Sequence, residues 1–250
     1  MRYRYPDGTQ ALAGIDFHLD QGECAALLGA NGSGKTTFVL HLNGLLSGEG
    51  SVEVCGIQLN HAHGGHGDRA DLDRVRAKVG LVFQDSDEQL FMPTVLEDVS
   101  FGPLNLGLDP EAATARARRM LERVGMAEAL EKAPYHLSAG EKKRVAIAGI
   151  LAMEPEILVL DEPTTFLDPP GQRALAELLM DLPQAKILVT HDVPFAEAMC
   201  GRAVFFEKGR IAADGAVSEI VERYGWRFTL CPPASAAGVG RPRGASLPGK

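Results

Sequence analysis

Residues 24–46 read CAALLGANGSGKTTFVLHLNGLL, and this stretch decides the fold. Its first five residues, Cys24 to Leu28, are small or apolar and predict a buried strand. The next eight, Gly29 to Thr36, match the pattern G-x-x-x-x-G-K-[ST], and the amphipathic segment after them predicts a helix. A strand, a glycine-rich loop of this kind and a helix together predict a phosphate-binding loop in an α/β domain.

The residue types in this loop suit the oxygens of a nucleotide. Glycines let successive backbone N–H groups converge on phosphate, a lysine supplies positive charge near the β and γ phosphates, and a threonine hydroxyl can ligate Mg²⁺. By composition alone, the pattern would arise in about one random chain in a hundred of this length. The residues that we expect to bind nucleotide here are Gly29, Asn31, Gly32, Ser33, Gly34, Lys35, Thr36 and Thr37.

Other apolar runs predict the rest of the sheet. Strands are expected at Gly80 to Phe83, Ile157 to Leu160 and Lys186 to Thr190, mostly as continuous apolar runs that helices cover on both faces. Residues 51–59 and 203–215 contain turn signals and are predicted as antiparallel ribbons with one solvated face, at an edge. Strands alternating with helices predict an α/β fold with a mostly parallel sheet.

The character of the chain changes between Asp85 and Glu154. Asp109, Pro110 and Glu111 are typical of a helix start, and helical periodicity follows. We therefore predict a nucleotide-binding core formed by residues 1–84 and 155–230, interrupted by an inserted helical subdomain at 85–154. Residues 231–250 are rich in Gly, Pro, Ala and Ser and are expected to be disordered.

Composition narrows the functional classes. The chain has 250 residues, of which 45% are apolar, and its 25 basic and 33 acidic residues give a net charge of -8 that disfavours nucleic acid as a partner. Its four cysteines are too few and too scattered for a disulfide framework, which favours a reducing cytosol. No apolar run approaches the roughly 20 residues of a membrane span, and the N-terminus does not resemble a signal peptide.

Two further motifs carry chemistry. Asp161 and Glu162 follow a buried apolar run, so Asp161 is placed to hold Mg²⁺ and Glu162 to accept a proton from an attacking water, although an acidic strand end of no consequence is the alternative. Ser138 and Glu141 in LSAGE have capping-box spacing; the same segment, with Gly140, could present a helix N-terminus to an anion. The residues alone leave both interpretations of LSAGE open.

The order of the motifs resembles the ATP-binding cassette (ABC) family from about Tyr5 to Trp226. That order is the phosphate loop, Gln84 after a strand, LSAGE, LVLDEP, Leu167-Asp168, and His191 after another strand. The resemblance implies that two such subunits enclose two ATP molecules, with the LSAGE segment completing the site of the opposite subunit and Asp168 linking the sites. It implies adenine stacking by Tyr5; catalysis by Lys35, Gln84, Glu162 and His191; ATP contacts from Ser138, Gly140 and Glu141; and Mg²⁺ ligation by Thr36, Gln84 and Asp161.

A finer resemblance is to ATPase subunits of energy-coupling-factor importers, the cobalt/nickel type in particular. It is carried by YRYPDGTQALAGI (3–15), FQDSDEQLFMPTVLEDVSFGPLNLGL (83–108) and LSAGEKKRVAIAGILAMEPEILVLDEPT (137–164). It implies that Asp85 to Phe91 form a short helix that seats a coupling helix of a membrane subunit. Leu90, Phe91 and Met92 would be the apolar docking surface, with ordinary core as the alternative.

Some positions depart from the family pattern. Ala139 and Glu141 stand where glycine and glutamine are usual, and Phe166 stands where a small residue usually precedes Leu-Asp. The N-terminus lacks the strand that usually precedes the adenine-stacking aromatic residue. Either the sequence starts inside the natural chain, or the edge ribbon is one strand short.

A histidine-rich loop raises a separate question. His61, His63 and His66, with Asp68, could bind a transition metal as a sensor or store, and the alternative is a solvent-exposed polar loop without function.

Together these features predict an ATPase that energises a membrane importer from the cytoplasmic face of the cell membrane, with ATP and Mg²⁺ as cofactors. The expected partners are a second, identical ATPase subunit, a membrane coupling subunit docking near Asp85 to Met92, and a membrane component that binds the cargo. The expected cargo is cobalt or nickel, with a vitamin such as biotin as the alternative. Less favoured are a soluble cassette ATPase acting on ribosomes or DNA, and a small-molecule P-loop kinase.

Overall fold

The computed structural model describes residues 1–60 and 68–227. The histidines at 61, 63 and 66 and the predicted tail at 231–250 lie outside the described residues.

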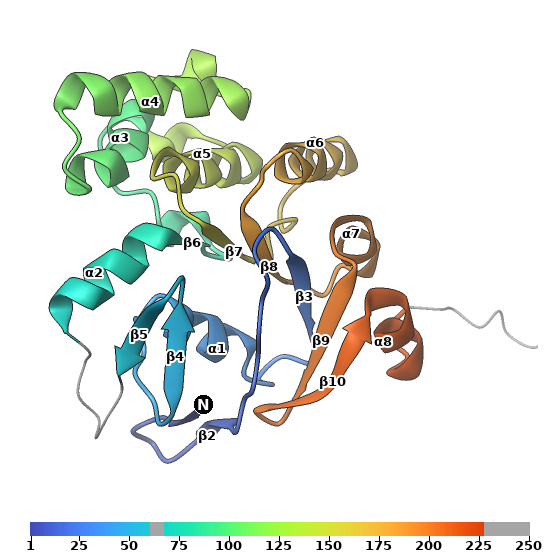
Figure 1. Ribbon diagram of the computed structural model, residues 1–250. Helices are drawn as coiled ribbons and strands as arrows, with labels where there is room; N and C mark the ends of the chain where they lie inside the picture. Colours follow the sequence, from blue (N-terminus) through green and yellow to red (C-terminus); the bar gives the residue numbers. More distant parts are fainter. Residues whose placement is uncertain (61–67, 228–250) are drawn as a thin grey trace, which may run out of the picture.

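A six-stranded sheet forms the centre of the molecule, in the order β10-β9-β3-β8-β7-β6 (Figure 1). Five strands run parallel: β3 (Cys24–Leu28), β6 (Val79–Val82), β7 (Ile157–Asp161), β8 (Ala185–Val189) and β9 (Arg202–Glu207). The edge strand β10 (Arg210–Ala216) is antiparallel to β9. The predicted α/β fold with a mostly parallel sheet is confirmed, with strand ends within one residue of those expected.

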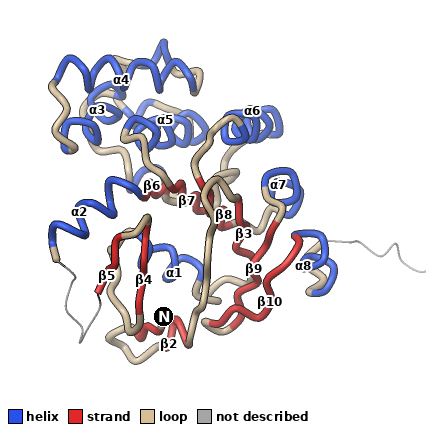
Figure 2. The backbone as a smooth tube through the Cα atoms, in the orientation of Figure 1, coloured by secondary structure: helices blue, strands red, loops and turns tan. Residues whose placement is uncertain are grey.

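The sheet is buried on both faces because side chains alternate along its strands. On β3, Ala26 and Leu28 pack with apolar residues of the helices α6 (Pro169–Met180), α7 (Val193–Met199) and α8 (Val217–Arg223). Leu27 points to the other face and packs with α1 (Lys35–Leu42) and α2 (Arg69–Lys78). Figure 2 shows the strands of the sheet between these groups of helices.

Two short antiparallel ribbons stand apart from the main sheet. They are β1 (Arg2–Arg4) with β2 (Gln10–Ala13), and β4 (Ser51–Val54) with β5 (Ile57–Asn60). The ribbon at 51–59 was predicted correctly as antiparallel, but it forms a sheet of its own. The prediction that the N-terminal strand is missing is wrong, since β1 directly precedes Tyr5.

The second predicted ribbon, at 203–215, also needs a correction. Its two strands do pair as an antiparallel hairpin, but only β10 lies at the sheet edge and alternates between exposed and half-buried residues. β9 lies between β10 and β3 and is buried at Ala203 to Phe206, so it has no solvated face. Its apolar run AVFF is the signal of this inner position.

Residues 85–154 contain α3 (Val95–Asn105), α4 (Pro110–Arg123) and α5 (Ala139–Ala152), together with short 3₁₀ turns at Ser86–Glu88, Ala127–Ala129 and Pro134–His136. The Asp109 side chain accepts the N–H of Ala112, so α4 begins with the expected cap. The three helices share a cluster of buried residues, among them Val99, Leu121 and Val145. Figure 1 shows them gathered at one side of the sheet, next to β6 and β7.

The cysteines are less scattered in space than in sequence. The structure joins Cys24 of β3 to Cys200, which follows α7, in a disulfide, with Cα atoms 4.9 Å apart. A single link is not a disulfide framework, so the favoured reducing compartment stays a prediction.

No helix in the described part of the chain is long and apolar enough to cross a membrane.

Candidate functional site

The loop between β3 and α1 requires glycine at two positions because the backbone there is left-handed and crowded. A Cβ on Gly29, at φ 139°, would lie 2.3 Å from the carbonyl oxygen of Phe206. A Cβ on Gly34, at φ 108°, would lie 2.6 Å from the carbonyl oxygen of Ala11. The loop is thus curled against β2 and β9, and the N-terminus of α1 opens at its end.

Lys35 lies across this loop. Its Nζ donates hydrogen bonds to the carbonyl oxygens of Gly29, at 2.6 Å, and Ala30, at 3.1 Å. Burial lowers the pKa of Lys35, and the negative charges of Glu162 and Asp161 oppose that shift. The structure therefore holds a partly desolvated ammonium where the sequence predicted phosphate binding.

Thr36, in the first turn of α1, lies beside Asp161 at the end of β7. The Thr36 hydroxyl donates to Oδ2 of Asp161, at 3.3 Å, across 125 residues of sequence. Burial raises the pKa of Asp161, and the neighbouring charge of Glu162 adds to the effect. A carboxylate and a hydroxyl side by side are oxygen ligands of the kind that Mg²⁺ takes, so these residues fit the expected metal.

Glu162 lies at the carboxyl edge of the sheet, with a left-handed backbone at φ 46°. One carboxylate oxygen is 2.8 Å from Nδ1 of His191. The other accepts the Thr190 hydroxyl at 3.2 Å and the N–H of His191 at 3.4 Å. The register of β7 and β8 explains this grouping. Asp161 at the end of β7 is paired with Val189 at the end of β8, so Glu162 and the segment Thr190–His191, which follow these two residues, come out side by side. The structure therefore brings together the two residues expected to act on the γ-phosphate.

Gln84 follows β6 and so lies at the same edge of the sheet as Asp161, which ends the neighbouring strand β7. Its side chain is exposed. Its carbonyl oxygen accepts a hydrogen bond from Lys143 of α5 at 2.7 Å.

Tyr5 lies beside the first turn of α1. Its hydroxyl is 3.0 Å from Oγ1 of Thr37, and its ring is edge-on to Tyr3 with the ring centroids 5.0 Å apart. The aromatic ring expected to stack on adenine is thus next to the end of the phosphate loop.

The capping-box interpretation of LSAGE is correct. The Ser138 hydroxyl accepts the N–H of Glu141, and the Glu141 carboxylate accepts the N–H and hydroxyl of Ser138. These hydrogen bonds lower the pKa of Glu141. Among the described residues, no hydrogen bond joins Ser138 or Glu141 to the phosphate loop of the same chain, so the two motifs are not gathered into one site within a single subunit.

Phe166 and Asp168 flank Leu167, which lies against Gly140 at the start of α5. Asp168 caps α6 by accepting the N–H of Gly171 at 2.8 Å. Phe166 is 69% exposed and has a left-handed backbone at φ 68°, which is unusual for a bulky side chain. Leu167 packs close to Gly140, so this segment contacts the start of α5.

An apolar surface surrounds Phe91. The side chain of Phe91 is 64% exposed, and its ring lies edge-on to Phe101 of α3 at 5.0 Å. Phe101 and Leu104, one turn apart on α3, are 40% and 42% exposed. Phe91, Phe101 and Leu104 are called the Phe91 surface below. Leu90, by contrast, packs on the core of the helical insert, so the core interpretation holds for that residue.

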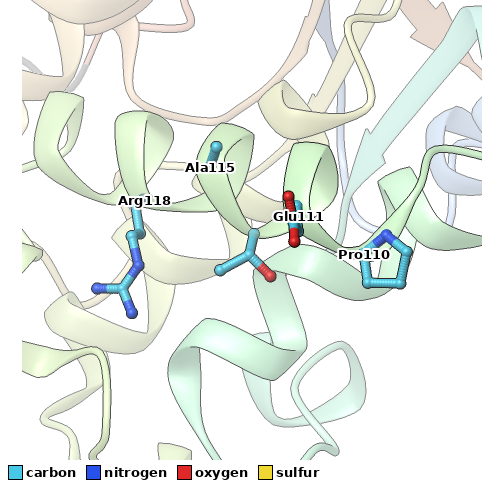
Figure 3. A pocket seen from close by; sticks show the side chains of 5 residues that line it. Pro110, Glu111, Ala115 and Arg118 are labelled. Atoms are coloured by element: carbon cyan, nitrogen blue, oxygen red, sulfur yellow. The ribbon is translucent and has the colours of Figure 1, made fainter.

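A shallow hollow of about 440 Å³ lies elsewhere, on α4 (Figure 3). Its lining residues, Pro110, Glu111, Thr114, Ala115 and Arg118, all belong to that single helix. A hollow over one helix does not bring polar groups from different elements together, as a binding site does. The candidate site therefore remains the one at the carboxyl ends of the parallel strands.

The described residues contain no cluster of three or more His, Cys, Asp or Glu suited to a metal ion. Asp68, which the sequence grouped with three histidines, caps α2 by accepting the N–H of Ala70.

Sequence reasoning missed three contributors. Thr190 holds Glu162, Lys143 holds the main chain at Gln84, and Phe101 extends the apolar surface. For Lys143 a signal existed, since it stands four and eight residues before Ile147 and Leu151 on a predicted helix, and so on the same apolar side. The other two depend on packing between segments far apart in sequence.

Comparison of this chain with known protein families and solved structures agrees with this geometry. The family model for ABC transporters matches residues 12–165. The chain is 49% identical over 222 residues to the energy-coupling factor transporter ATP-binding protein EcfA of Methanosphaera stadtmanae, covering 87% of this chain and 78% of EcfA.

Two solved structures share the fold. One is cbiO1 from Clostridium perfringens, part of the ABC transporter complex cbiONQ, with a TM-score of 0.77, 37% identity and coverage of 89% of this chain and 88% of that one. The other is the dimeric ATP-binding cassette MJ0796 bound to ADP and Pi, with a TM-score of 0.76, 28% identity and coverage of 86% and 95%. The chain therefore belongs to the ABC transporter family and is an ATP-binding subunit related to EcfA and cbiO1, an ATPase whose hydrolysis of ATP is coupled to transport.

Proposed function

We propose that this chain is the ATPase of an energy-coupling-factor importer and that Glu162 is its general base. The observation that carries this proposal is the grouping of Glu162 with His191 at the sheet edge where Thr36 meets Asp161. Relatedness to EcfA and cbiO1 supports the importer type.

In the proposed reaction, a water oxygen attacks the γ-phosphorus of ATP while the bond to the β-phosphate oxygen breaks. Glu162 accepts the proton of that water, and the products are ADP and phosphate. Thr190 and His191 orient the carboxylate through the bonds described above. Lys35 and the backbone N–H groups of the loop bind the β and γ phosphates, so the negative charge of ATP replaces the carbonyl oxygens that Lys35 now contacts.

Thr36 and Asp161 would hold Mg²⁺, with Gln84 as a further ligand from the neighbouring strand end. The ion supplies charge neutralisation at the phosphate oxygens when it is bound. Tyr5 is proposed to stack on adenine.

We propose that two subunits enclose ATP, each presenting Ser138, Gly140 and Glu141 to the phosphate loop of the other. Support comes from the separation of the capping box and the phosphate loop in one chain, and from the dimeric state of the related cassette MJ0796. The start of α5 and the segment before α6 would form the contact between subunits, with Asp168 between the two sites. We expect two identical subunits.

The membrane partner is proposed to dock on the Phe91 surface, on the side of the insert formed by α3 and the segment after Gln84. Exposed aromatic side chains in contact with each other are typical of an interface, since their apolar area is otherwise left in water. In this proposal residues 1–84 and 155–230 act as the nucleotide-binding core, and residues 85–154 act as the insert that responds to the partner. The subunit would then lie at the cytoplasmic face of the cell membrane.

The proposed cargo is a cobalt or nickel ion, bound by a separate membrane component, on the basis of the resemblance to the cobalt/nickel type. A vitamin is the alternative cargo.

The test is a pull-down from detergent-solubilised membranes of the natural host. Tagged Glu162→Gln protein, loaded with MgATP, is expected to retain integral membrane proteins, and their identification by mass spectrometry separates metal from vitamin cargo. Phe91→Ser in the same background should lose them, whereas Met180→Ser, an exposed apolar residue at the end of α6, should not. Recovery of soluble ribosomal or DNA-bound proteins alone would contradict the transport role.

A further inference from the structure

Lys143 is an unusual residue in this fold because its charged side chain is completely buried. Its exposed fraction is 0%, as low as that of the most deeply buried apolar residues of the described chain. In the described part of the chain no carboxylate lies within ion-pair distance of its Nζ. Burying an ammonium without a paired acid costs free energy unless hydrogen bonds satisfy it. The hydrogen-bond acceptors of Lys143 therefore point to its role.

Those partners are the main chain on either side of the bond between Phe83 and Gln84. Lys143 Nζ donates to the carbonyl oxygen of Phe83, at 3.0 Å, and to that of Gln84, at 2.7 Å. Burial lowers the pKa of Lys143, and the negative charges of Asp161, Asp85 and Glu162 oppose this shift. The ammonium thus joins helix α5 to the end of β6 within the field of the catalytic carboxylates.

The preceding residue makes a second connection to the same segment. Lys142 Nζ is 2.5 Å from a carboxylate oxygen of Asp87, in the turn that follows Gln84. Two consecutive lysines of α5 therefore hold residues 83–87, one from inside the protein and one at the surface. The helix that carries them begins at the Ser138 capping box.

We propose that Lys143, assisted by Lys142, is a positioning residue that fixes Gln84 to helix α5, so that Gln84 and the Ser138–Glu141 segment move together when the Phe91 surface is engaged. We call Lys142 and Lys143, with the main chain of residues 83–87, the lysine clamp; its 83–87 segment carries Gln84 and is followed closely in the chain by Phe91. The inference rests on the proposed roles of Gln84 and Glu162. It assigns to Lys143 a task that does not require contact with ATP.

The test compares two buried lysines in the full chain. Lys186 is 6% exposed and lies near the start of β8, where it donates to the carbonyl oxygens of Leu182 and Gln184, whereas Gln84 follows the carboxyl end of β6. Lys186→Met therefore removes bonds of the same type as Lys143→Met, at the opposite end of the parallel strands. Lys143→Met is expected to lower kcat for ATP hydrolysis by on the order of 10-fold to 100-fold, with the affinity for ATP changed by less than about threefold. Lys186→Met is expected to keep kcat within about twofold of the wild type, and Lys143→Arg to recover most of the lost turnover.

Equal loss of kcat in the two methionine variants would overturn the proposal, as would a fall in ATP affinity as large as the fall in kcat. If Lys143→Met does not fold, Lys142→Ala decides, because its ion pair lies at the surface: turnover should fall severalfold at an unchanged melting temperature, and unchanged turnover refutes the clamp. The proposed function fails separately, if Glu162→Gln retains wild-type turnover.

Discussion

Replacing Gly34 by alanine tests the geometry of the phosphate loop directly. Two costs add at this position. The left-handed backbone at φ 108° disfavours any residue with a Cβ, by about 1–2 kcal/mol, and the new methyl group would lie 2.6 Å from the carbonyl oxygen of Ala11. Relieving that overlap requires the loop or β2 to shift, which costs a further 1–3 kcal/mol or so. The free energy of unfolding should therefore fall by about 2–5 kcal/mol.

Gly107 supplies the matched control. It has a left-handed backbone at φ 90°, but a Cβ there would meet no atom within 4 Å. Gly107→Ala should therefore lose only the backbone cost of about 1–2 kcal/mol. Urea denaturation measures the free energy of unfolding of both variants, and the difference between them is the cost of the overlap at Gly34. ATP affinity is then measured for Gly34→Ala and for the wild type. The reasoning is refuted if both variants lose the same stability, or if Gly34→Ala binds ATP as tightly as the wild type.

Two further predictions concern the helical insert. Burial raises the pKa of Asp98 from 3.8 to about 6. Between these pH values the folded state binds a proton that the unfolded state has lost. The free energy of unfolding that this carboxyl contributes therefore falls as pH rises from about 4 to 6. Asp98→Asn should remove this fall, which is at most about 3 kcal/mol, and parallel pH dependences of unfolding for variant and wild type would contradict it. Ser138→Ala should cost about 1 kcal/mol by removing the cap of α5, whereas Glu141→Gln keeps the capping box and should be nearly neutral in the same thermal unfolding assay.

The sequence predicted the main architecture because its signals are local. Apolar runs such as Ile157 to Leu160 define the central strands, and Asp109-Pro110 defines a helix start; both need only nearest neighbours along the chain. The motif at Gly29 to Thr36 works for the same reason, since loop, lysine and hydroxyl are contiguous.

Features that depend on pairing between distant segments were missed or misplaced. The inner position of β9 follows from its contact with β3, and the disulfide joins residues 176 positions apart. Lys143 reaches its carbonyl partners across about 60 residues of sequence, and no periodicity encodes where its ammonium ends. Likewise, Phe91 is exposed while its neighbour Leu90 is half-buried against the cluster that α3 shares with α4 and α5, a difference that only the packing of these helices sets.

The most direct test of the central claim is the rate of ATP hydrolysis by Glu162→Gln, measured together with its association state in the presence and absence of MgATP. The carboxylate that pairs with His191 is assigned as the base, so the amide should lower turnover by on the order of 10²-fold to 10⁴-fold. ATP binding should persist, and the variant should accumulate as a dimer with MgATP and dissociate without it. Wild-type turnover in this variant would contradict the assignment of Glu162, and a monomer under all conditions would contradict the shared site.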